Sequence, residues 1–459
     1  MISAAPHPAH APIAALSTAP YNAAIGVVRV SGTGAHDVAA RVFRPDGSSP
    51  FLPVRARSAR VGVVYGADKA IDRAVVTCWR APHSYTGEDM AEFSCHGGRV
   101  VLTAVLEALL EAGARMAEPG EFTKRAFLNG KLDLAQSEAV IDLIQAESLG
   151  AAASAYAQLE GALSARIEQV RALLVDCDAD IMAYVDFEQE GVQAPIPEAI
   201  QANLQQATAH LDALLATCGR ARIVREGAVT VLLGRPNVGK SSLLNALTGR
   251  ARSIVTELPG TTRDMVEQPL VIGGQLILLQ DTAGVRETSH PVERLGVERT
   301  VLAASEADLI LAVFDSSAPL ERADMDVMAL CTGRNAIAVC NKVDLNRALD
   351  PDTLRAHFSQ VLEVSAKTLD GMDALAQAVG ALFAPADNRD VLVNLRQADG
   401  LRGAREAIER VLAALAEGIE PDIAEIDLRA AIEQLDRITG RSVTEDVLDS
   451  IFTRFCVGK

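Results

Sequence analysis

The sequence predicts a multidomain fold in which an α+β domain comes first and a P-loop α/β domain is inserted into an all-α helical domain that is split in sequence. Three observations lead to this prediction. Strand-like runs punctuated by glycine fill residues 24–95, apolar residues recur at helical spacing over 132–216 and again after 401, and strands alternate with helices over 229–383. Because 459 residues exceed the usual length of one domain, two or three domains are expected.

The N-terminal domain, residues 1–130, is expected to hold four strands and one helix. The predicted strands are residues 24–30, 61–65, 74–79 and 90–94. The helix follows at 100–112, where Gly113 ends the helical pattern. Residues 1–12 have neither the basic start nor the apolar run of a signal peptide, and they are expected to be loose.

Helical segments flank the α/β domain on both sides. The predicted boundaries are 131–226 for the first helical part, 227–386 for the α/β domain, and 387–459 for the second helical part with a cysteine-containing tail. A sheet of this kind needs no long helices before or after it, so we expect one helical domain that carries the α/β domain as an insertion. Two separate helical domains are the alternative.

A phosphate-binding loop opens the α/β domain. Residues 234–241 (GRPNVGKS) follow the apolar run 228–233 and precede the helical run 242–247. In such a loop the backbone N–H groups cradle phosphates, Lys240 reaches the β and γ oxygens, and Ser241 can ligate Mg²⁺. The sequence therefore predicts nucleotide binding.

Further motifs appear in the order that a GTPase needs them, each after a predicted strand or in a loop. Residues 260–264 (GTTRD) can bring a threonine to Mg²⁺, and 281–284 (DTAG) supply a carboxylate near the metal and a glycine N–H near the γ-phosphate. Within 341–344 (NKVD), the Asp344 carboxylate can pair with two N–H donors of guanine, which adenine does not offer together. Residues 365–367 (SAK) place a backbone N–H near the guanine carbonyl oxygen. GTP is therefore the predicted ligand.

The group that positions the attacking water is not identified by these motifs. Many GTPases carry a glutamine directly after the DTAG glycine, but this chain carries Val285, which cannot orient water. The charged candidates nearby are Arg286, Glu287, Glu293 and Arg294. A solvated charged loop explains most of them equally well, and no arginine finger can be assigned.

Composition and charge restrict the class of protein further. A net charge of −17 argues against coating of nucleic acid or anionic membrane by bulk electrostatics, so an RNA contact must be a local patch. The seven cysteines form no C-x-x-C pair and are expected to be reduced thiols. No apolar run approaches membrane-spanning length, so a cytoplasmic protein without a membrane partner is expected.

Taken together, these features resemble the MnmE family, also called TrmE. Besides the nucleotide motifs and the hydrophobic residue after DTAG, the resemblance rests on residues 119–136 (PGEFTKRAFLNGKLDLAQ) and on the terminal residues 455–459 (FCVGK). It covers nearly the whole chain. It implies a homodimeric, potassium-stimulated GTPase that works with the flavoprotein MnmG. The pair would build aminomethyl or carboxymethylaminomethyl groups on C5 of the wobble uridine (U34) of certain tRNAs.

The resemblance also implies roles in the GTP site. K⁺ would be held by Asn237, Thr256, Leu258 and Thr261, and Mg²⁺ by Ser241 and Thr262. The K⁺ ion would replace the missing arginine finger, and Glu293 would polarise or orient the water. The residues then expected to contact GTP are Asn237, Val238, Gly239, Lys240, Ser241, Ser242, Thr256, Glu257, Leu258, Pro259, Gly260, Thr261, Thr262, Asp281, Thr282, Ala283, Gly284, Asn341, Lys342, Val343, Asp344, Ser365, Ala366 and Lys367.

The N-terminal domain of the family binds a one-carbon tetrahydrofolate, of the 5,10-methylene or 5-formyl type, at the dimer interface. The implied contacts are Arg29, Glu92, Lys131 and the terminal Lys459. Basic groups suit a glutamate tail, and a carboxylate suits the amino-pyrimidinone edge of a pterin. Cys456 would face the folate or the modification chemistry, or else serve as a small apolar residue in a docked tail. Relatives usually carry T-P-P-G where residues 18–24 read TAPYNAA, so a reshaped pocket is expected.

Two other function classes share the nucleotide motifs. A ribosome-assembly GTPase would be expected to carry a basic RNA-binding appendage, whereas this chain ends in an acidic helical segment and a cysteine tail. A regulatory switch that hydrolyses slowly would fit Val285. Dependence on potassium separates that switch from the favoured prediction.

Overall fold

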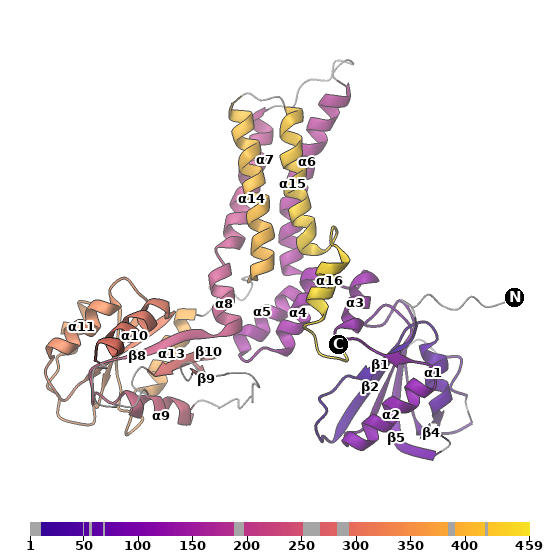
Figure 1. The fold of residues 1–459 in the computed structure, drawn as a ribbon, viewed down its shortest axis with the longest axis horizontal. Helices are drawn as coiled ribbons and strands as arrows, with labels where there is room; N and C mark the ends of the chain where they lie inside the picture. The colour runs from indigo at the N-terminus through magenta and orange to yellow at the C-terminus, as the bar shows by residue number, and fades with distance from the viewer. Residues whose placement is uncertain are drawn as a thin grey trace. The chain divides into compact units, whose positions relative to one another are not determined.

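The computed structural model describes residues 11–48, 50–54, 57–67, 69–187, 197–250, 267–281, 293–383, 391–417 and 421–459. The chain forms two compact units: the first comprises Met1–Ile141 and Ile432–Lys459, and the second comprises Asp142–Ala431. The described elements confirm the predicted fold class, since an α+β unit, a P-loop α/β domain and helices on both sides of that domain are all present (Figure 1). The predicted domain boundaries stay a prediction.

The first unit is built on a seven-stranded sheet with the strand order β3-β4-β5-β6-β2-β1-β7. Its strands are β1 (Ile13–Leu16), β2 (Ile25–Ser31), β3 (Phe43–Pro45), β4 (Ser58–Gly66), β5 (Lys69–Trp79), β6 (Met90–His96) and β7 (Arg115–Met116). Neighbouring strands are antiparallel, except that β1 and β7 are parallel. The four predicted strands correspond to β2, β4, β5 and β6, whereas β1, β3 and β7 were not predicted.

One face of this sheet is covered by α1 (Ala35–Val42) and α2 (Arg99–Glu111). In α2 the buried residues Leu102, Val105, Leu106 and Leu109 follow the helical spacing i, i+3, i+4, i+7, which explains why this segment forms a helix against the sheet. In β2, Val28 and Val30 are buried in the same core, while Arg29 between them points to the other face.

Four further helical segments belong wholly or partly to the first unit: α3 (Glu121–Leu128), α4 (Leu134–Ile144), α15 (Pro421–Thr439) and α16 (Glu445–Phe452). Of these, α16 packs against α3. The chain then ends against the N-terminal part of the same unit, where Val457 forms an isolated antiparallel bridge with Pro119.

The α/β domain of the second unit contains a six-stranded sheet with the order β13-β12-β11-β8-β10-β9. Its strands are β8 (Ala228–Leu233), β9 (Glu267–Ile272), β10 (Gln275–Asp281), β11 (Leu309–Asp315), β12 (Ala336–Asn341) and β13 (Gln360–Glu363). All pairs are parallel except β9 with β10.

Helices cover both faces of this sheet: α9 (Lys240–Arg250) and α13 (Met372–Phe383) on one, and α10 (Glu293–Glu306), α11 (Arg322–Cys331) and α12 (Pro351–Arg355) on the other. Each face has its own apolar core. The strands are accordingly apolar over almost their whole length, as expected of parallel strands that are buried on both sides.

The remaining helices of the second unit are α5 (Leu149–Leu159), α6 (Ala162–Phe187), α7 (Pro197–Leu215), α8 (Cys218–Glu226) and α14 (Leu395–Ala416). Helix α7 packs against both α6 and α14, and α14 is joined to α15 by an ion pair of 2.7 Å between Arg410 and Asp427 (Figure 1). Helices from before and after the α/β domain therefore pack together, which favours the single helical domain over two separate ones. Among the helices that the structure describes, none combines the length and hydropathy needed to span a membrane.

Candidate functional site

The phosphate loop and the NKVD and SAK motifs lie at one edge of the sheet in the second unit. Strands β8, β10, β11, β12 and β13 are parallel, so their carboxyl ends meet at that edge. The phosphate loop joins β8 to α9, Asn341 ends β12, and Ser365 follows β13. Ligands of open α/β sheets bind at this edge, and these three motifs are therefore gathered where one nucleotide can reach them.

The phosphate loop is packed so closely that glycine is required at Gly239. This residue has φ of 99°, and a Cβ there would collide with the side-chain nitrogen of Asn341. Lys240, at the start of α9, donates hydrogen bonds from Nζ to the carbonyl oxygens of Gly234 (2.6 Å) and Arg235 (2.9 Å). Its ammonium group therefore lies at the loop itself, where the family of phosphate loops places the β- and γ-phosphates.

Asn341 connects the phosphate loop to the last of the motifs. Its amide nitrogen donates to the carbonyl oxygen of Val238 at 2.9 Å, and its amide oxygen accepts from the backbone N–H of Ala366 at 3.0 Å. Asn341 is almost fully buried, so both bonds are made away from water. Asp344 accepts a hydrogen bond of 2.7 Å from the Ser365 hydroxyl, which orients the carboxylate.

Asp315, at the end of β11, is a site residue that the sequence reasoning missed. Its carboxylate accepts from Lys342 Nζ at 2.6 Å, and the same ammonium donates to the carbonyl oxygen of Asn237 at 2.7 Å. Burial alone would raise the pKa of Asp315, but hydrogen bonds from Lys342 and Ser317 hold it below its ordinary value. The signal that could have identified it is its position directly after the apolar run 309–314.

Asn237 and Lys342 both have backbone conformations that are uncommon outside glycine, with φ of 65° and 66°. The hydrogen bond between them fixes one strained residue against the other. Asp315 therefore anchors a short chain of contacts that runs from the base-reading NKVD motif to the phosphate loop.

Part of the predicted GTP site lies outside the described residues. This applies to Thr256, Glu257, Leu258, Pro259, Gly260, Thr261, Thr262, Thr282, Ala283 and Gly284, and also to Val285, Arg286 and Glu287. Asp281 ends β10 and Glu293 begins α10, but their side chains are also outside the described part of the chain.

The first unit holds a second cluster, centred on Arg29 of β2. Arg29 and Glu92 are direct neighbours across β2 and β6, and Arg29 donates from Nε (2.8 Å) and Nη2 (2.7 Å) to Glu92 Oε1. The guanidinium lies 5.3 Å from the ring centre of Tyr85 and 5.4 Å from that of Phe122. Its third nitrogen, Nη1, is buried and has no hydrogen-bond partner among the described residues.

The C-terminal tail brings Lys459 to this cluster. Burial and then repulsion by Arg29 lower the pKa of the Lys459 amine, while Glu92 acts in the opposite direction. Ser17 donates a hydrogen bond of 3.2 Å to the carbonyl oxygen of Gly458. Gly458 has φ of 100°, and a Cβ there would collide with the backbone carbonyl of Leu16, so the tail can lie in this position only with glycine.

The other residues predicted for this site are placed differently. Lys131 is exposed and follows α3, where it packs beside Gly87. Cys456 is exposed, and its carbonyl oxygen accepts from the backbone N–H of Gly120 at 3.4 Å. The segment 19–24, in which the sequence departs from T-P-P-G, is also exposed. The structure thus brings Arg29, Glu92 and Lys459 together.

A strand-to-helix phosphate loop that meets the NKVD and SAK motifs at one sheet edge defines the class of protein: a GTP-binding P-loop GTPase. The family model described as the MnmE helical domain matches residues 134–456, and that of the GTP-binding protein TrmE N-terminus matches residues 12–131. The chain therefore belongs to the MnmE family.

Full-length relatives agree with this assignment. The chain is 44% identical to the tRNA modification GTPase MnmE of Symbiobacterium thermophilum, 43% to that of Heliobacterium modesticaldum and 43% to that of Chloroflexus aurantiacus. Each match covers 97% of this chain and 99% of the relative. The similarity thus spans both units and not only the nucleotide-binding domain.

Proposed function

We propose that this chain is a potassium-activated GTP hydrolase that modifies tRNA in the cytoplasm as a homodimer, together with the flavoprotein MnmG. The product would carry an aminomethyl or carboxymethylaminomethyl group on C5 of the wobble uridine (U34) of certain tRNAs, with a one-carbon tetrahydrofolate as carbon donor. The observation that carries the proposal is the length of the match, because relatives named tRNA modification GTPase correspond to this chain over 99% of their own length.

In the GTP site, described residues would bind both ends of the nucleotide. Lys240 would exchange its two carbonyl partners for phosphate oxygens, which are stronger, charged acceptors. Asp344, oriented by Ser365, would accept the two N–H groups of guanine. Lys342 would hold the phosphate loop against the base-reading motif through the carbonyl oxygen of Asn237.

The metal sites are supported by the chemistry of the available donors. The hydroxyl of Ser241 and the amide oxygen of Asn237 are hard oxygen ligands on exposed residues of the loop and first helical turn. The cations would supply positive charge against the charge that develops on the phosphates. Ser241 and Thr262 are the proposed Mg²⁺ ligands, and Asn237, Thr256, Leu258 and Thr261 the proposed K⁺ ligands. Glu293 is proposed to orient the water, in the absence of a glutamine at position 285.

The Arg29 cluster fits a folate in three respects. Arg29 Nη1 is a buried donor that has no partner in the described part of the chain, which costs free energy unless a ligand accepts from it. The rings of Tyr85 and Phe122 flank the guanidinium and suit a flat aromatic ligand. Lys459 adds a second cation, and Glu92 supplies an acceptor for the amino-pyrimidinone edge of a pterin. Lys131 and Cys456 complete the proposed site.

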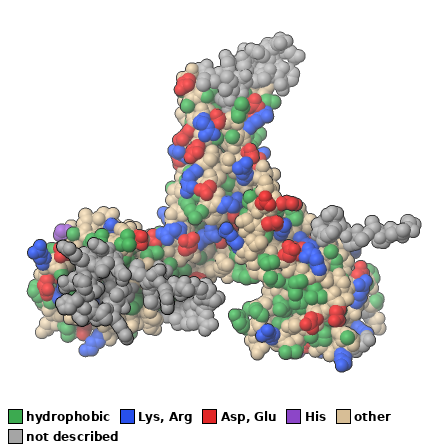
Figure 2. All heavy atoms as spheres, viewed as in Figure 1, with side chains coloured by type: hydrophobic (Ala, Val, Ile, Leu, Met, Phe, Trp, Pro, Cys, Tyr) green, Lys and Arg blue, Asp and Glu red, His purple; other side chains and the backbone are tan. Residues whose placement is uncertain are grey.

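The homodimer is supported by exposed apolar side chains on the face of the first sheet opposite α1 and α2, at β4, β5 and the start of β2. Val61 of β4 and Val75 of β5 are direct cross-strand neighbours on this face, and they are 48% and 41% exposed. Ile25 of β2 is 64% exposed. Figure 2 shows hydrophobic side chains gathered on the visible surface of this unit. Exposed apolar surface of this kind is typical of protein interfaces, and we propose a second copy of the chain as the partner.

A reconstituted reaction tests the proposal. The purified protein is combined with its MnmG partner, tRNA, GTP, K⁺, Mg²⁺ and tetrahydrofolate labelled in its one-carbon unit. We expect label on the wobble uridine only when GTP, folate and both proteins are present. GTP hydrolysis without any transfer of label would contradict the modification function and leave only a GTPase.

A further inference from the structure

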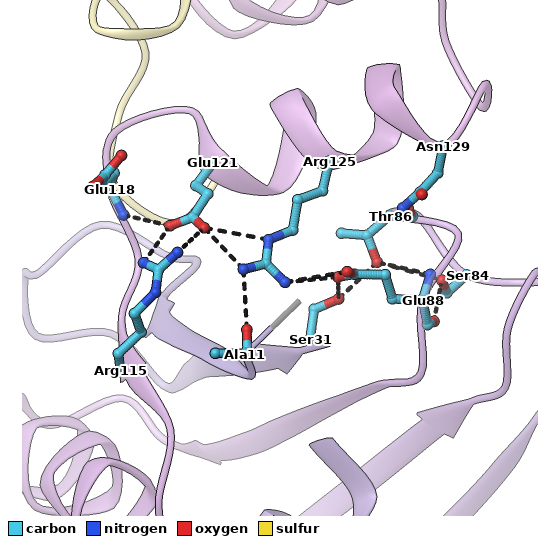
Figure 3. A network of polar contacts seen from close by, with 10 residues as sticks. All are labelled: Ala11, Ser31, Ser84, Thr86, Glu88, Arg115, Glu118, Glu121, Arg125 and Asn129. Carbon is cyan, nitrogen blue, oxygen red and sulfur yellow. Dashed lines mark hydrogen bonds and ion pairs between the residues drawn. The ribbon is translucent and has the colours of Figure 1, made fainter. Parts of the chain in front are cut away.

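The motif at residues 119–136 contains a buried polar network that neither proposed site uses directly. Figure 3 shows this network between α3, β7 and the segment 84–88, which connects β5 to β6. The side chains of Arg125, Glu88 and Glu121 are 5%, 11% and 9% exposed. Charged groups of such low exposure need partners of opposite charge, and here the partners come from three separate parts of the first unit.

Arg125 is the centre of the network. Its Nη1 donates to both carboxylate oxygens of Glu88 at 3.1 Å, and Nη2 donates to Glu121 at 2.9 Å and to the carbonyl oxygen of Ala11 at 3.0 Å. Glu88 also accepts from the hydroxyl of Ser31 at 3.1 Å. The guanidinium therefore ties the segment 84–88 to α3 and, through Ser31, to the end of β2.

The segment 84–88 in turn contacts two of the residues proposed to bind folate. Tyr85 lies beside the guanidinium of Arg29 and shares a hydrogen bond of 2.8 Å with Thr123. Gly87 lies so close to the residues that follow α3 that a Cβ there would be 3.0 Å from Cβ of Asn129 and 3.2 Å from Cγ of Lys131. The position of this segment therefore affects both cationic residues.

Neutral hydrogen bonds also hold the segment: Tyr85 shares its bond with Thr123 of α3, and Thr86 shares one of 2.6 Å with Ser31 of β2. Among the described contacts, the amide of Asn129 donates to the carbonyl oxygen of Thr86 at 2.7 Å. The ion pair between Glu88 and Arg125 is thus the charged attachment of the segment, and the others are neutral. Charge-assisted hydrogen bonds are about twice as strong as neutral ones, so this pair should be the strongest single attachment of the segment.

We propose that Arg125 is a positioning residue for the cofactor site: through Glu88 it holds the segment 84–88 so that Tyr85 and Gly87 fix Arg29 and Lys131 for an anionic folate. This inference rests on the proposed folate-binding function. Arg125 does not itself contact the ligand, because its guanidinium is buried among Glu88, Glu121 and Ala11.

The chain offers a matched control in Arg115. Arg115 donates to the same carboxylate, Glu121, at 2.8 Å, but it reaches no residue of the segment 84–88 among the contacts described. Replacing Arg115 therefore removes an ion pair from the same network while leaving the attachment of the segment intact. Glu88→Gln removes the charged attachment of the segment to Arg125 and leaves the Arg115–Glu121 ion pair in place. The glutamine has the same shape as glutamate and can still accept a hydrogen bond from Ser31.

The experiment compares the full-length variants Arg125→Gln, Glu88→Gln and Arg115→Gln with the wild type. Binding of 5-formyltetrahydrofolate is measured by calorimetric titration, and GTP hydrolysis and the melting temperature are measured on the same samples. We expect Arg125→Gln and Glu88→Gln to raise the folate Kd about tenfold or more, the ratio that corresponds to loss of one charge-assisted hydrogen bond. Arg115→Gln should change it less than twofold, and GTP hydrolysis should be unchanged in all three.

A second readout does not depend on the ligand. Burial raises the pKa of the Tyr85 phenol, and the hydrogen bond with Thr123 and the charge of Arg29 oppose this only in part. Release of the segment should return that pKa toward its ordinary value in Glu88→Gln but not in Arg115→Gln. The difference spectrum against Tyr85→Phe isolates this residue from the other four tyrosines of the five in the chain.

The outcomes distinguish a failure of the positioning role of Arg125 from a failure of the proposed folate-binding function. Equal folate affinity in Glu88→Gln and wild type, with an unchanged Tyr85 titration, would overturn the positioning role of Arg125. Equal losses in all three variants would also overturn it, because they would indicate a general loss of stability. If the wild type itself binds no folate, the proposed function fails, while the Tyr85 titration still decides whether Arg125 holds the segment.

Discussion

Replacement of Asp315 by asparagine should weaken nucleotide binding although Asp315 belongs to none of the predicted motifs. The asparagine keeps the shape and one acceptor oxygen but removes the negative charge that faces Lys342 Nζ at 2.6 Å. A hydrogen bond to a charged group contributes about 1.5–3 kcal/mol, and because Lys342 keeps its charge in the variant, roughly half of this contribution should be lost. The expected loss is therefore about 1–1.5 kcal/mol.

This loss should appear in the affinity for GTP, because Lys342 also bonds to Asn237 in the phosphate loop. About 1.4 kcal/mol corresponds to a tenfold change in Kd. Titration of wild type and Asp315→Asn with GTP and with GDP should show a Kd that is about tenfold higher for both nucleotides in the variant. GTP and GDP should be affected alike, because Lys342 connects the phosphate loop to the NKVD motif and both nucleotides contact these two segments.

Asp308 provides the control at the opposite end of the same strand. Its carboxylate pairs with Arg222 and accepts from the backbone N–H of Val229 at 2.9 Å, away from the nucleotide edge. Asp308→Asn should lower the melting temperature and leave the nucleotide Kd unchanged. If Asp315→Asn binds GTP like the wild type while it melts as early as Asp308→Asn, the carboxylate stabilises the fold alone and the reasoning is wrong.

The pH dependence of stability follows from the ion pair between Asp315 and Lys342. The folded-state pKa of Asp315 lies below its ordinary value, so the contribution of the pair to folding is present above the unfolded pKa. It is lost as the pH falls through the lower, folded-state pKa. Acid unfolding curves of wild type and Asp315→Asn should therefore differ most above about pH 4 and converge below it.

Four further predictions concern the proposed roles. Asp344→Asn should shift preference from GTP toward xanthosine triphosphate, because an amide donor matches the second carbonyl of xanthine, and unchanged GTP affinity would contradict the guanine-reading role. K⁺ should accelerate hydrolysis far more than Na⁺, and Asn237→Ala should remove most of this advantage; equal rates in both salts at matched ionic strength would refute the K⁺ site. Glu293→Ala should bind GTP normally but hydrolyse it about 10²-fold more slowly or worse, whereas a near wild-type rate would assign the water to another group. Cys456→Ser should abolish uridine modification and leave GTP hydrolysis and dimerisation intact, and full modification by this variant would exclude the thiol from the chemistry.

Much of the α/β domain could be predicted because its signals are local. The run 228–233 is β8 in the structure, and the NKVD motif follows β12 as its apolar strand predicts. A buried parallel strand and the loop after it appear in the sequence as one continuous pattern, an apolar run followed by polar residues. Asp315 also follows an apolar run directly, but it belongs to no named motif, and only its contact with Lys342 shows its importance.

The first unit was less predictable because its important contacts join distant parts of the chain. Strand β1 is short and was not predicted, yet the C-terminal Gly458 lies against Leu16 at its end. Glu88 and Arg125 are 37 residues apart, and their ion pair depends on how α3 packs against the sheet. Periodicity describes one element at a time and therefore cannot predict which elements meet.

The most direct measurement is mass spectrometry of wobble uridines in tRNA from cells that lack this protein. Complementation with the wild-type chain should restore the aminomethyl or carboxymethylaminomethyl group on C5. Complementation with Asp344→Asn or Cys456→Ser should leave the uridine without this group, because either GTP recognition or the proposed thiol is lost. Normally modified wobble uridines in the deletion strain would contradict the account.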